Sequence, residues 1–492
     1  MKLIALLAFL PLAYFAYPQK APIFTPSFTI SDQPTHKVPE GQAYTFGYLE
    51  VLENRAKPTS NTIKLPIYIF KSRSKNPKPD PIIYTVGGPG YTSMRAAQYM
   101  KYYQYLDDRD LILFEQRGTQ YAQPHLACPE WAEAVYYSNL PAFDETQSDS
   151  LFAQAATQCR ARLEAQGIDL NAYHTNAIAA DIADLRKVLG IDQYNLLTIS
   201  YSTKIAQVLM RDYPKGIRSV VMDSPLPLEW NYDEVSNANL LAAVEKLLDD
   251  CAASEDCNSA FPNLKERFFN YLAAKTAQPL ELTIDHPTTG TPQTFYLKGK
   301  DLIRVFTAFG TGGVPNIPLE MHKILENDLS SVKEMLAEVF NAPGKGNGKG
   351  MRLSVWCAEE FPFVSQAKVV AETQRYPAIR GQAPAVFSEA VCNAWKVAPA
   401  AAIENEPVQS DIPVLFISGE YDNETPPHLA VQMQKNFPNS FHLLFKGWKH
   451  TPTTNWGNPC AMQAANDFFN QPDVQPHPEC FEAVGTPVFK TK

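Results

Sequence analysis

The chain has 492 residues, enough for two or three domains or for one domain that carries a large insertion. Apolar residues make up 45% of the sequence and charged residues 19%, which excludes wholesale disorder. The formal net charge is -9 and there is no long basic block. Nucleic acid is therefore not an expected partner, because phosphate backbones bind clustered lysine and arginine side chains.

The first residues have the pattern of a targeting segment. Lys2 supplies a positive start, and an almost unbroken apolar run follows from Leu3 to Ala16. The run is too short to span a bilayer comfortably, and polar, proline-rich sequence follows at once. We predict that residues 1–16 are a cleaved signal peptide and that the mature protein is secreted or periplasmic and not held in a membrane. An uncleaved N-terminal anchor is the alternative.

Eight cysteines lie outside this segment. An even number in an exported chain indicates disulfides. None has a CxxC spacing or a zinc-like arrangement with histidine, so we expect no metal site, and we expect no cofactor. Eight cysteines allow about 105 connectivities, so the sequence does not settle the pairing. Pairing of sequence neighbours is the simplest arrangement and would join Cys128 to Cys159, Cys251 to Cys257, Cys357 to Cys392, and Cys460 to Cys480.

Short apolar runs bounded by turn residues recur along the chain and are typical of parallel strands buried on both faces. Helix-period stretches lie between several of them, which predicts a parallel sheet flanked by helices. The alternation stops from 230 to 411, where the sequence is mostly helical. We predict one sheet domain built from residues 17–229 and 412–492, with 230–411 inserted as a helical lid. The strand-like runs are 82–86, 111–114, 194–199, 219–222, 414–417 and 441–445.

Ser200 stands where the run 194–199 meets a helical stretch. A serine at such a sharp turn projects its hydroxyl above the sheet, and the next amide can help to stabilise an oxyanion. The usual pattern is G-x-S-x-G, whereas Thr198 and Ser202 occupy the two glycine positions here. By itself this segment also fits a structural serine at a helix cap.

A glycine-rich loop, Gly87-Gly88-Pro89-Gly90, follows the run 82–86 and favours the catalytic interpretation. Glycines at this place let a backbone amide approach a developing negative charge.

An acid and a base follow the last two strand-like runs. Asp422 comes directly after the run 414–417, and His450 follows the run 441–445 at loop distance. Glu420 and Glu424 are rival acids, but Asp422 stands just before a Thr-Pro-Pro helix start. An acid here can fix the histidine tautomer and stabilise the imidazolium. The order Ser, Asp, His predicts an α/β-hydrolase fold with the triad Ser200, Asp422 and His450.

The chain resembles the exported tripeptidyl and prolyl aminopeptidase-like serine peptidases of the α/β-hydrolase superfamily. The resemblance covers about residues 40–480, although the lid matches loosely. It implies that Gly88 and Tyr201 provide the oxyanion-hole amides. The motifs that carry it are Gly87-Gly-Pro-Gly90, Glu115-Gln-Arg-Gly118, Ser200-Tyr-Ser-Thr-Lys204, Gly419-Glu-Tyr-Asp422 and Gly447-Trp-Lys-His450.

The sequence departs from that family at three places. Thr198 and Ser202 replace the glycines around the nucleophile, and Glu115 stands where the family usually has aspartate. We expect the segment around Glu115 to be scaffold, with Arg117 in a buried ion pair.

The resemblance implies an exported aminopeptidase that releases residues or short peptides from free N-termini through an acyl-enzyme on Ser200. In this family carboxylates of the lid bind the substrate ammonium. Glu359, Glu360 and Glu229 are our candidates, with ordinary solvated acids as the alternative. An esterase with the same triad stays open as an alternative, because the fold does not fix the scissile bond. A non-catalytic binding protein is a second alternative.

Overall fold

The computed structural model of the protein describes residues 24–138, 145–286, 289–340, 348–376 and 387–492. The predicted signal peptide, residues 1–16, lies outside the described residues. Within the described ranges, no helix combines the length and the apolar character that a membrane span needs.

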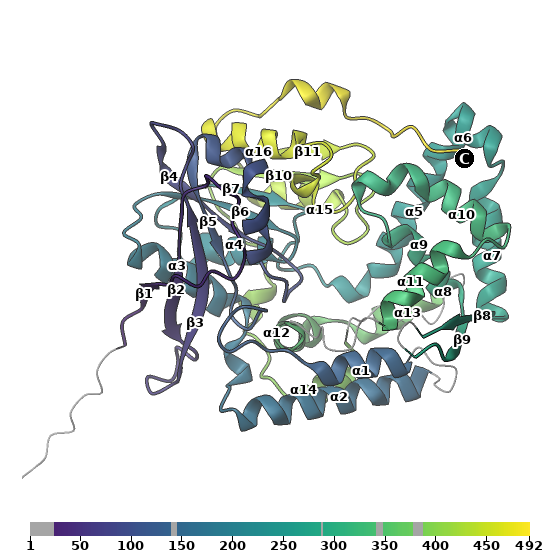
Figure 1. The fold of residues 1–492 in the computed structure, drawn as a ribbon, viewed down its shortest axis with the longest axis horizontal. Coiled ribbons are helices and arrows are strands. Elements are labelled where there is room, and N and C mark those ends of the chain that lie inside the picture. Colours follow the sequence, from purple (N-terminus) through teal and green to yellow (C-terminus); the bar gives the residue numbers. More distant parts are fainter. Residues whose placement is uncertain (1–23, 139–144, 287–288, 341–347, 377–386) are drawn as a thin grey trace, which may run out of the picture.

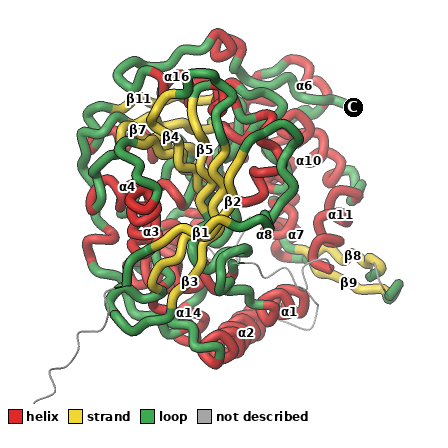
Figure 2. Tube along the Cα trace, turned by 60° about the vertical axis from the view of Figure 1, so that its left-hand side comes forward, coloured by secondary structure: helices red, strands yellow, loops and turns green. Residues whose placement is uncertain are grey.

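A nine-stranded sheet forms the centre of the molecule (Figures 1 and 2). The strands are β1 (Ser27–Ile30), β2 (Tyr44–Leu52), β3 (Thr62–Phe70), β4 (Lys78–Thr85), β5 (Arg109–Phe114), β6 (Tyr194–Ile199), β7 (Ile217–Asp223), β10 (Val414–Gly419) and β11 (Ser440–Phe445). Their order is β1-β2-β3-β5-β4-β6-β7-β10-β11. The first three strands pair antiparallel, and β3 is antiparallel to β5. From β5 to β11 all neighbours are parallel, as the apolar runs predict.

The sheet is buried on both faces because successive side chains of its strands enter different cores. Ile83 belongs to a core that includes α3 (Thr175–Val188) and α4 (Ser202–Asp212). Its neighbour Ile82 belongs to a second core with α16 (Cys460–Asn470). The central strand β6 is buried at every residue, which explains why its sequence is a continuous apolar run and not an alternating one.

The segment between β7 and β10 forms a separate helical region, to the right of the sheet and below it in Figure 1. The predicted lid boundaries, 230 and 411, fall in the connections after β7 and before β10. A two-stranded antiparallel sheet of β8 (Leu280–Asp285) and β9 (Pro292–Leu297) also lies here and was not predicted. The helices are α5 (Ser236–Ala253), α6 (Glu255–Ala260), α7 (Leu264–Ala277), α8 (Gly299–Leu302), α9 (Arg304–Thr307), α10 (Ile317–Leu325), α11 (Ser330–Phe340), α12 (Lys349–Val355), α13 (Gln366–Arg375) and α14 (Glu389–Trp395).

This region is held in two ways. Helices α5 to α10 enclose a hydrophobic core of their own. Helices α12 and α14 instead join the core on the α3 side of the sheet, together with α1 (Pro129–Ser138) and α2 (Glu145–Ala165), which precede β6 in the chain. Figure 1 shows α1, α2, α12 and α14 as one layer below the sheet.

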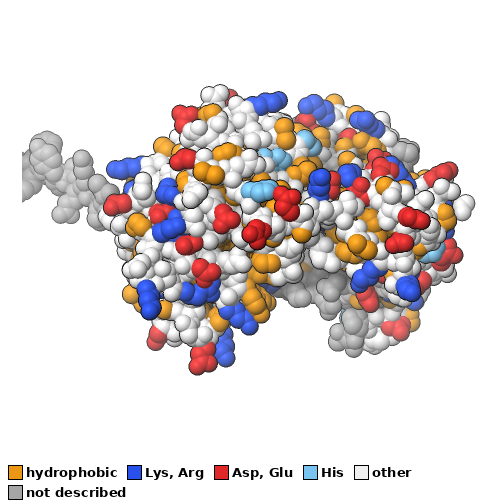
Figure 3. Space-filling model, turned by 90° about the horizontal axis from the view of Figure 1, so that it is seen from above, with side chains coloured by type: hydrophobic (Ala, Val, Ile, Leu, Met, Phe, Trp, Pro, Cys, Tyr) orange, Lys and Arg blue, Asp and Glu red, His pale blue; other side chains and the backbone are white. Residues whose placement is uncertain are grey.

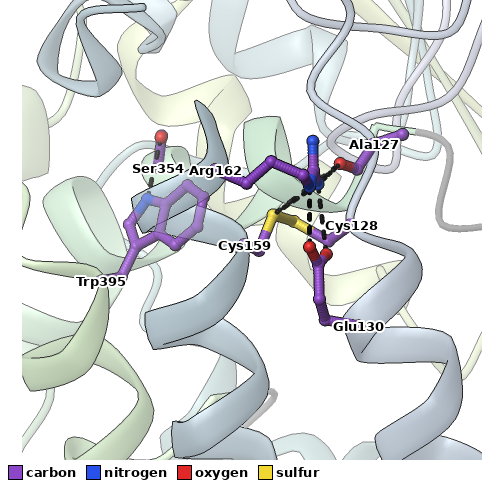
Figure 4. The surroundings of a disulfide bond; sticks show 7 residues. All are labelled: Ala127, Cys128, Glu130, Cys159, Arg162, Ser354 and Trp395. Carbon is purple, nitrogen blue, oxygen red and sulfur yellow. Dashed lines mark hydrogen bonds and ion pairs between the residues drawn. A yellow bond between two sulfur atoms is a disulfide. The ribbon is translucent and has the colours of Figure 1, made fainter. Parts of the chain in front are cut away.

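The four predicted disulfides are confirmed: Cys128–Cys159, Cys251–Cys257, Cys357–Cys392 and Cys460–Cys480. The first fastens the start of α1 to α2, beside an ion pair of 2.7 Å between Arg162 Nε and Glu130 Oε1 (Figure 4). Cys128, Glu130 and Cys159 lie close enough together to be potential metal ligands. Both thiols are oxidised and Glu130 is neutralised by Arg162, so these side chains have a structural role.

The buried ion pair predicted for Arg117 is confirmed. Its guanidinium donates to both carboxylate oxygens of Asp181, each at 2.7 Å, and both side chains are fully buried. It also donates to the carbonyl oxygens of Glu53 and Ala172. Glu115 is scaffold as well, because its buried carboxylate accepts from backbone amides of two loops.

Replacing Asp181 with alanine would leave the Arg117 guanidinium buried without a counter-charge and would also remove the ion pair with Arg55. We expect a loss of about 3–5 kcal/mol in the free energy of unfolding, because an uncompensated buried charge is costly. Chemical denaturation followed by fluorescence measures this loss. The matched control is Lys187→Ala, which removes an exposed pair with Asp184 and should change stability by less than about 1 kcal/mol. Equal effects of the two changes would contradict this account.

Candidate active site

Four loops that carry the predicted site residues meet at one edge of the sheet. Gly88 follows β4, Ser200 follows β6, Asp422 follows β10 and His450 follows β11. These strands are parallel, so their carboxyl ends lie on the same side. The sheet topology therefore brings together residues that are up to 362 positions apart, from Gly88 to His450.

Ser200 occupies a strained turn between β6 and α4. Its φ angle is +56°, in the left-handed region that non-glycine residues rarely adopt. A hydrogen bond of 2.9 Å from the Ser200 amide to the carbonyl of Asp223, at the end of β7, stabilises the turn. Gly87 packs directly against it, since a Cβ at residue 87 would lie 2.7 Å from Ser200 Cβ. A glycine is required there for the glycine-rich loop to approach the serine.

Thr198 and Ser202, which replace the usual glycines, are accommodated by hydrogen bonds. Both are completely buried. The Thr198 hydroxyl donates to the carbonyl of Val221 at 3.1 Å. The Ser202 hydroxyl contacts the carbonyl of Thr85 at 2.9 Å and accepts from the Ile199 amide at 2.8 Å. The two hydroxyls therefore connect the turn to strands β7 and β4 instead of obstructing it.

Asp422 and His450 form a close, ordered pair. Asp422 Oδ2 lies 2.8 Å from His450 Nδ1, and the carboxylate is completely buried. The other carboxylate oxygen, Oδ1, accepts from the amides of Glu424 and Thr425, both at 2.9 Å. The Thr425 hydroxyl donates to Oδ2 at 2.8 Å. These contacts fix the carboxylate, which in turn orients the imidazole.

The second nitrogen of His450 faces Glu424. Its Nε2 is 3.6 Å from Glu424 Oε2, and within the described residues Ser200 and His450 are not hydrogen-bonded to each other. Burial lowers the pKa of His450, but the charges of Asp422 and Glu424 outweigh this and raise that pKa to about 9. The pKa of Asp422 is lowered because the charge of His450 outweighs the effect of burial.

Ser200 opens into a small cavity of about 40 Å³. Gly88 and Tyr201 both line it, and among the described residues neither of their amides donates a hydrogen bond to another group. Two free amides beside the serine hydroxyl fit the requirement for binding an oxyanion. The other lining residues are Pro89, Leu226, Tyr232, Arg352, Val355, Trp356, Glu360, Glu424 and Thr425.

The structure separates the three acids proposed for binding the substrate ammonium. Glu360 lines the cavity, but its carboxylate is in a buried ion pair with Lys204. Glu359 points away and accepts from the Thr175 amide at 2.6 Å. Glu229 is not among the lining residues and accepts from Gln432 at 3.2 Å. Adjacent sequence positions therefore do not mean a shared site.

The residues next to the acid and the base are anchored in the helical region. Tyr421 is buried in the core of α5 to α10, and its hydroxyl donates to Asp250 at 2.6 Å. The ammonium of Lys449 donates to the carbonyl oxygens of Phe306 and Phe309, at 2.5 and 2.8 Å. The position of Asp422 and His450 thus depends on the insertion as well as on the sheet.

Asp223 anchors the loop that follows His450. Its carboxylate accepts from the amide of Thr453 at 2.9 Å, from the Thr453 hydroxyl, and from Ser224 at 3.2 Å. Burial raises the pKa of Asp223 to about 6 although these bonds act in the opposite direction.

Sequence reasoning missed the part of the cavity wall that the insertion contributes. Arg352 stacks over Trp356, with its guanidinium carbon 5.5 Å from the ring centroid, and both line the cavity opposite the core residues. Tyr232 completes this wall. No sequence pattern marks Arg352 and Trp356, because they reach the site through the packing of α12 and η6 (Trp356–Glu360), a π-helical turn. A π-helical turn is often found at functional sites.

The strand order, the antiparallel second strand and the three loops after β6, β10 and β11 define an α/β-hydrolase. Residues 381–480 match the family model described as TAP-like protein (Abhydrolase_4). The sequence is 22% identical to serine protease Hip1 of Mycobacterium tuberculosis over 452 residues, 86% of this chain and 84% of that protein. It is 25% identical to the tripeptidyl aminopeptidase of Streptomyces coelicolor over 189 residues, 36% of this chain and 34% of that protein.

These matches confirm the family resemblance that the sequence motifs predicted. The chain has the α/β-hydrolase fold and is similar in sequence to serine peptidases. Among solved structures, proline iminopeptidase of Mycobacterium smegmatis is 14% identical, with a TM-score of 0.38 over 84% of this chain and 96% of that one. The fold assignment rests on the sheet topology and not on this distant likeness.

The raised pKa of His450 predicts a pH dependence. Only a neutral imidazole can accept a proton from a serine hydroxyl, so we expect labelling of Ser200 by a fluorophosphonate to accelerate as pH rises. The labelling rate should reach half of its maximum near pH 9, the raised value, and not near the ordinary value of 6.5. Mass spectrometry of the labelled peptide at a series of pH values measures this. A rate that is already constant above pH 7 would contradict it.

Proposed function

We propose that this protein is an exported serine peptidase that acts as an aminopeptidase on free peptide N-termini. In this proposal Ser200 is the nucleophile, His450 the general base and Asp422 the residue that orients it. The amides of Gly88 and Tyr201 form the oxyanion hole. Peptides are the substrates, and no cofactor or metal takes part.

The observation that carries the proposal is the arrangement around Ser200. A serine in a strained turn lies beside two free backbone amides, and Glu424 and Thr425 of the loop that carries Asp422 line the same cavity. Asp422 holds His450, which belongs to the loop after β11. Acyl transfer requires this combination, because the nucleophile, the base and the oxyanion donors must converge on one carbonyl. The related serine protease and tripeptidyl aminopeptidase support a peptide as the acyl substrate.

The chemistry follows from these positions. His450 Nε2 removes the proton from Ser200 Oγ, which attacks the carbonyl carbon of the scissile bond. The negative charge that develops on the carbonyl oxygen is stabilised by the amides of Gly88 and Tyr201. The protonated imidazole then donates its proton to the leaving amine. Water, activated by the same imidazole, hydrolyses the acyl-enzyme. The base must turn from Glu424 toward Ser200 for the first step, and catalytic hydrogen bonds commonly tighten only when substrate binds.

Export is supported by the apolar segment of residues 3–16 and by the four disulfides, which persist in oxidising compartments. We infer a secreted or periplasmic location. Positive and negative side chains are interspersed on the face in Figure 3.

The proposal is tested with chromogenic peptides that carry either a free or an acetylated amino end. We expect cleavage of the free-ended peptides only, with the length of the released product giving the number of residues removed per cut. Ser200→Ala should lower turnover by about four orders of magnitude or more without changing the unfolding midpoint, because the nucleophile is lost while the scaffold stays.

Two outcomes would contradict the proposal. Equal cleavage of free and acetylated peptides, or cleavage of p-nitrophenyl esters alone, would keep the nucleophile but indicate an endopeptidase or an esterase. Activity that survives in Ser200→Ala would instead refute the assignment of the nucleophile.

A further inference from the structure

The carboxylate of Glu424 is placed where it can bind a cation that enters the cavity. Its side chain is 53% exposed and lines the cavity that contains Ser200. Within the described part of the chain, the imidazole of His450 is the only basic group within 4.0 Å of its carboxylate. The backbone of Glu424 is fixed by its amide, which donates to Asp422, so the side chain can turn while the loop stays in place.

The other carboxylates near the nucleophile already have partners. Lys204 neutralises Glu360, and Thr175 occupies Glu359 through its amide and hydroxyl. Asp422 is satisfied by His450 and two amides. A positively charged group that enters the cavity therefore meets one acceptor whose present contact, at 3.6 Å, is longer than a hydrogen bond.

Resting on the proposed aminopeptidase function, we propose that Glu424 receives the α-ammonium group of the peptide and that this contact releases His450 to serve Ser200. In the free protein the Glu424 carboxylate lies on the Nε2 side of the imidazole, where the serine hydroxyl must bond. An ammonium group donates up to three hydrogen bonds and competes for that carboxylate. When the side chain turns to the ammonium, Nε2 becomes free to face Ser200 Oγ.

This step releases one proton from His450. His450 faces the carboxylates of Asp422 and Glu424 and lies near Asp223. The other charged side chains that line the cavity are Arg352 and Glu360, and Glu360 is paired with Lys204. Tyr201 and Tyr232 are the ionisable hydroxyl groups of the lining, and the charge of Lys449 acts on both Asp422 and Glu424. Removing Glu424 from Nε2 takes away one of the charges that favour the imidazolium. The proton on Nε2 then passes to water, and the neutral imidazole can act as the base.

The protein would then select peptides with a free amino end in two ways, by binding them more tightly and by activating the catalytic base when they bind. A peptide with a free amino end binds Glu424 and creates the competent base in the same event. A blocked peptide or an ester lacks the ammonium, so it leaves the Glu424–His450 contact in place. Specificity for free N-termini would then come from a loop of the sheet domain, next to the triad, and not from acids of the lid.

The test compares Glu424→Gln with the wild type on matched free-ended and acetylated substrates, an ester among them, over a range of pH. For free-ended peptides we expect kcat/KM to fall about tenfold, because a charge-assisted contact with the ammonium is lost. For acetylated substrates and the ester we expect no such fall, and the acidic limb of the pH profile should move to lower pH. Preference for free amino ends would therefore collapse.

Two further variants sharpen the result. Glu424→Asp keeps the charge on a shorter side chain and should retain part of the preference. Glu406→Gln removes an exposed carboxylate outside the cavity and should behave as the wild type. Unfolding midpoints of all variants identify any loss that arises from folding. A change in Glu424→Gln that is equal for both substrate classes, or no change for either, would overturn the inference.

Failure of this inference is distinguishable from failure of the proposed function. If the wild type cleaves free-ended peptides only, and Glu424→Gln does so equally well, the aminopeptidase stands and Glu424 is not its ammonium ligand. If the wild type itself shows no preference for free ends, the proposed function fails first.

Discussion

The structure depends on the sharp turn that holds Ser200 above the sheet. A non-glycine residue at positive φ is unfavourable, and it persists only where the surroundings leave no alternative. Here the turn is constrained from three sides. Gly87 packs against it, the carbonyl of Asp223 binds its amide, and the Ser202 hydroxyl connects it to β4. Because these contacts come from β4 and β7, the two strands that flank β6, the serine is held in position only where all three strands are paired.

The positions of Asp422 and His450 depend on contacts with the helical insertion. Their loops leave β10 and β11, but Tyr421 and Lys449, which directly precede them, are anchored in the helical insertion. The insertion is therefore more than a cover over the site. A shift of α5 or α9 would be transmitted to Asp422 and His450 through two side chains that lie one residue away. The C-terminal segment joins the same region, since Phe489 is buried in the core of α5 to α10.

Some charged side chains at the cavity are neutralised by partners within the protein, and others are not. Lys204 and Glu360 cancel each other, and Asp422 is compensated by its hydrogen bonds and by His450. Arg352 and Glu424 remain as charges of opposite sign that line the same cavity without a strong ion pair among the described residues. A cavity with this pattern suits a ligand that itself carries localised charge, such as the end of a peptide chain.

The sequence by itself determined the local elements and the order in which they occur. Continuous apolar runs such as 194–199 specify strands buried on both faces, and the positions of Ser200, Asp422 and His450 after three such runs indicate one common edge. The cysteine count indicated disulfides, but it left the pairing open, and the fold decided that sequence neighbours are joined. Arg117 could be assigned to a buried ion pair from its motif, although not its partner, because Asp181 lies 64 positions away in helix α3.

Only the tertiary structure decided which acids face the nucleophile. Glu359 and Glu360 are neighbours in sequence, yet one binds Thr175 and the other Lys204, because consecutive side chains of a helical turn point in different directions. The role of α1 and α2 as part of the layer with α14 was hidden for a related reason. Helices that are distant in the chain share a core only when packing brings their apolar faces together. Strand periodicity is a local property, whereas the choice of partners for buried charges and helix faces depends on the whole fold.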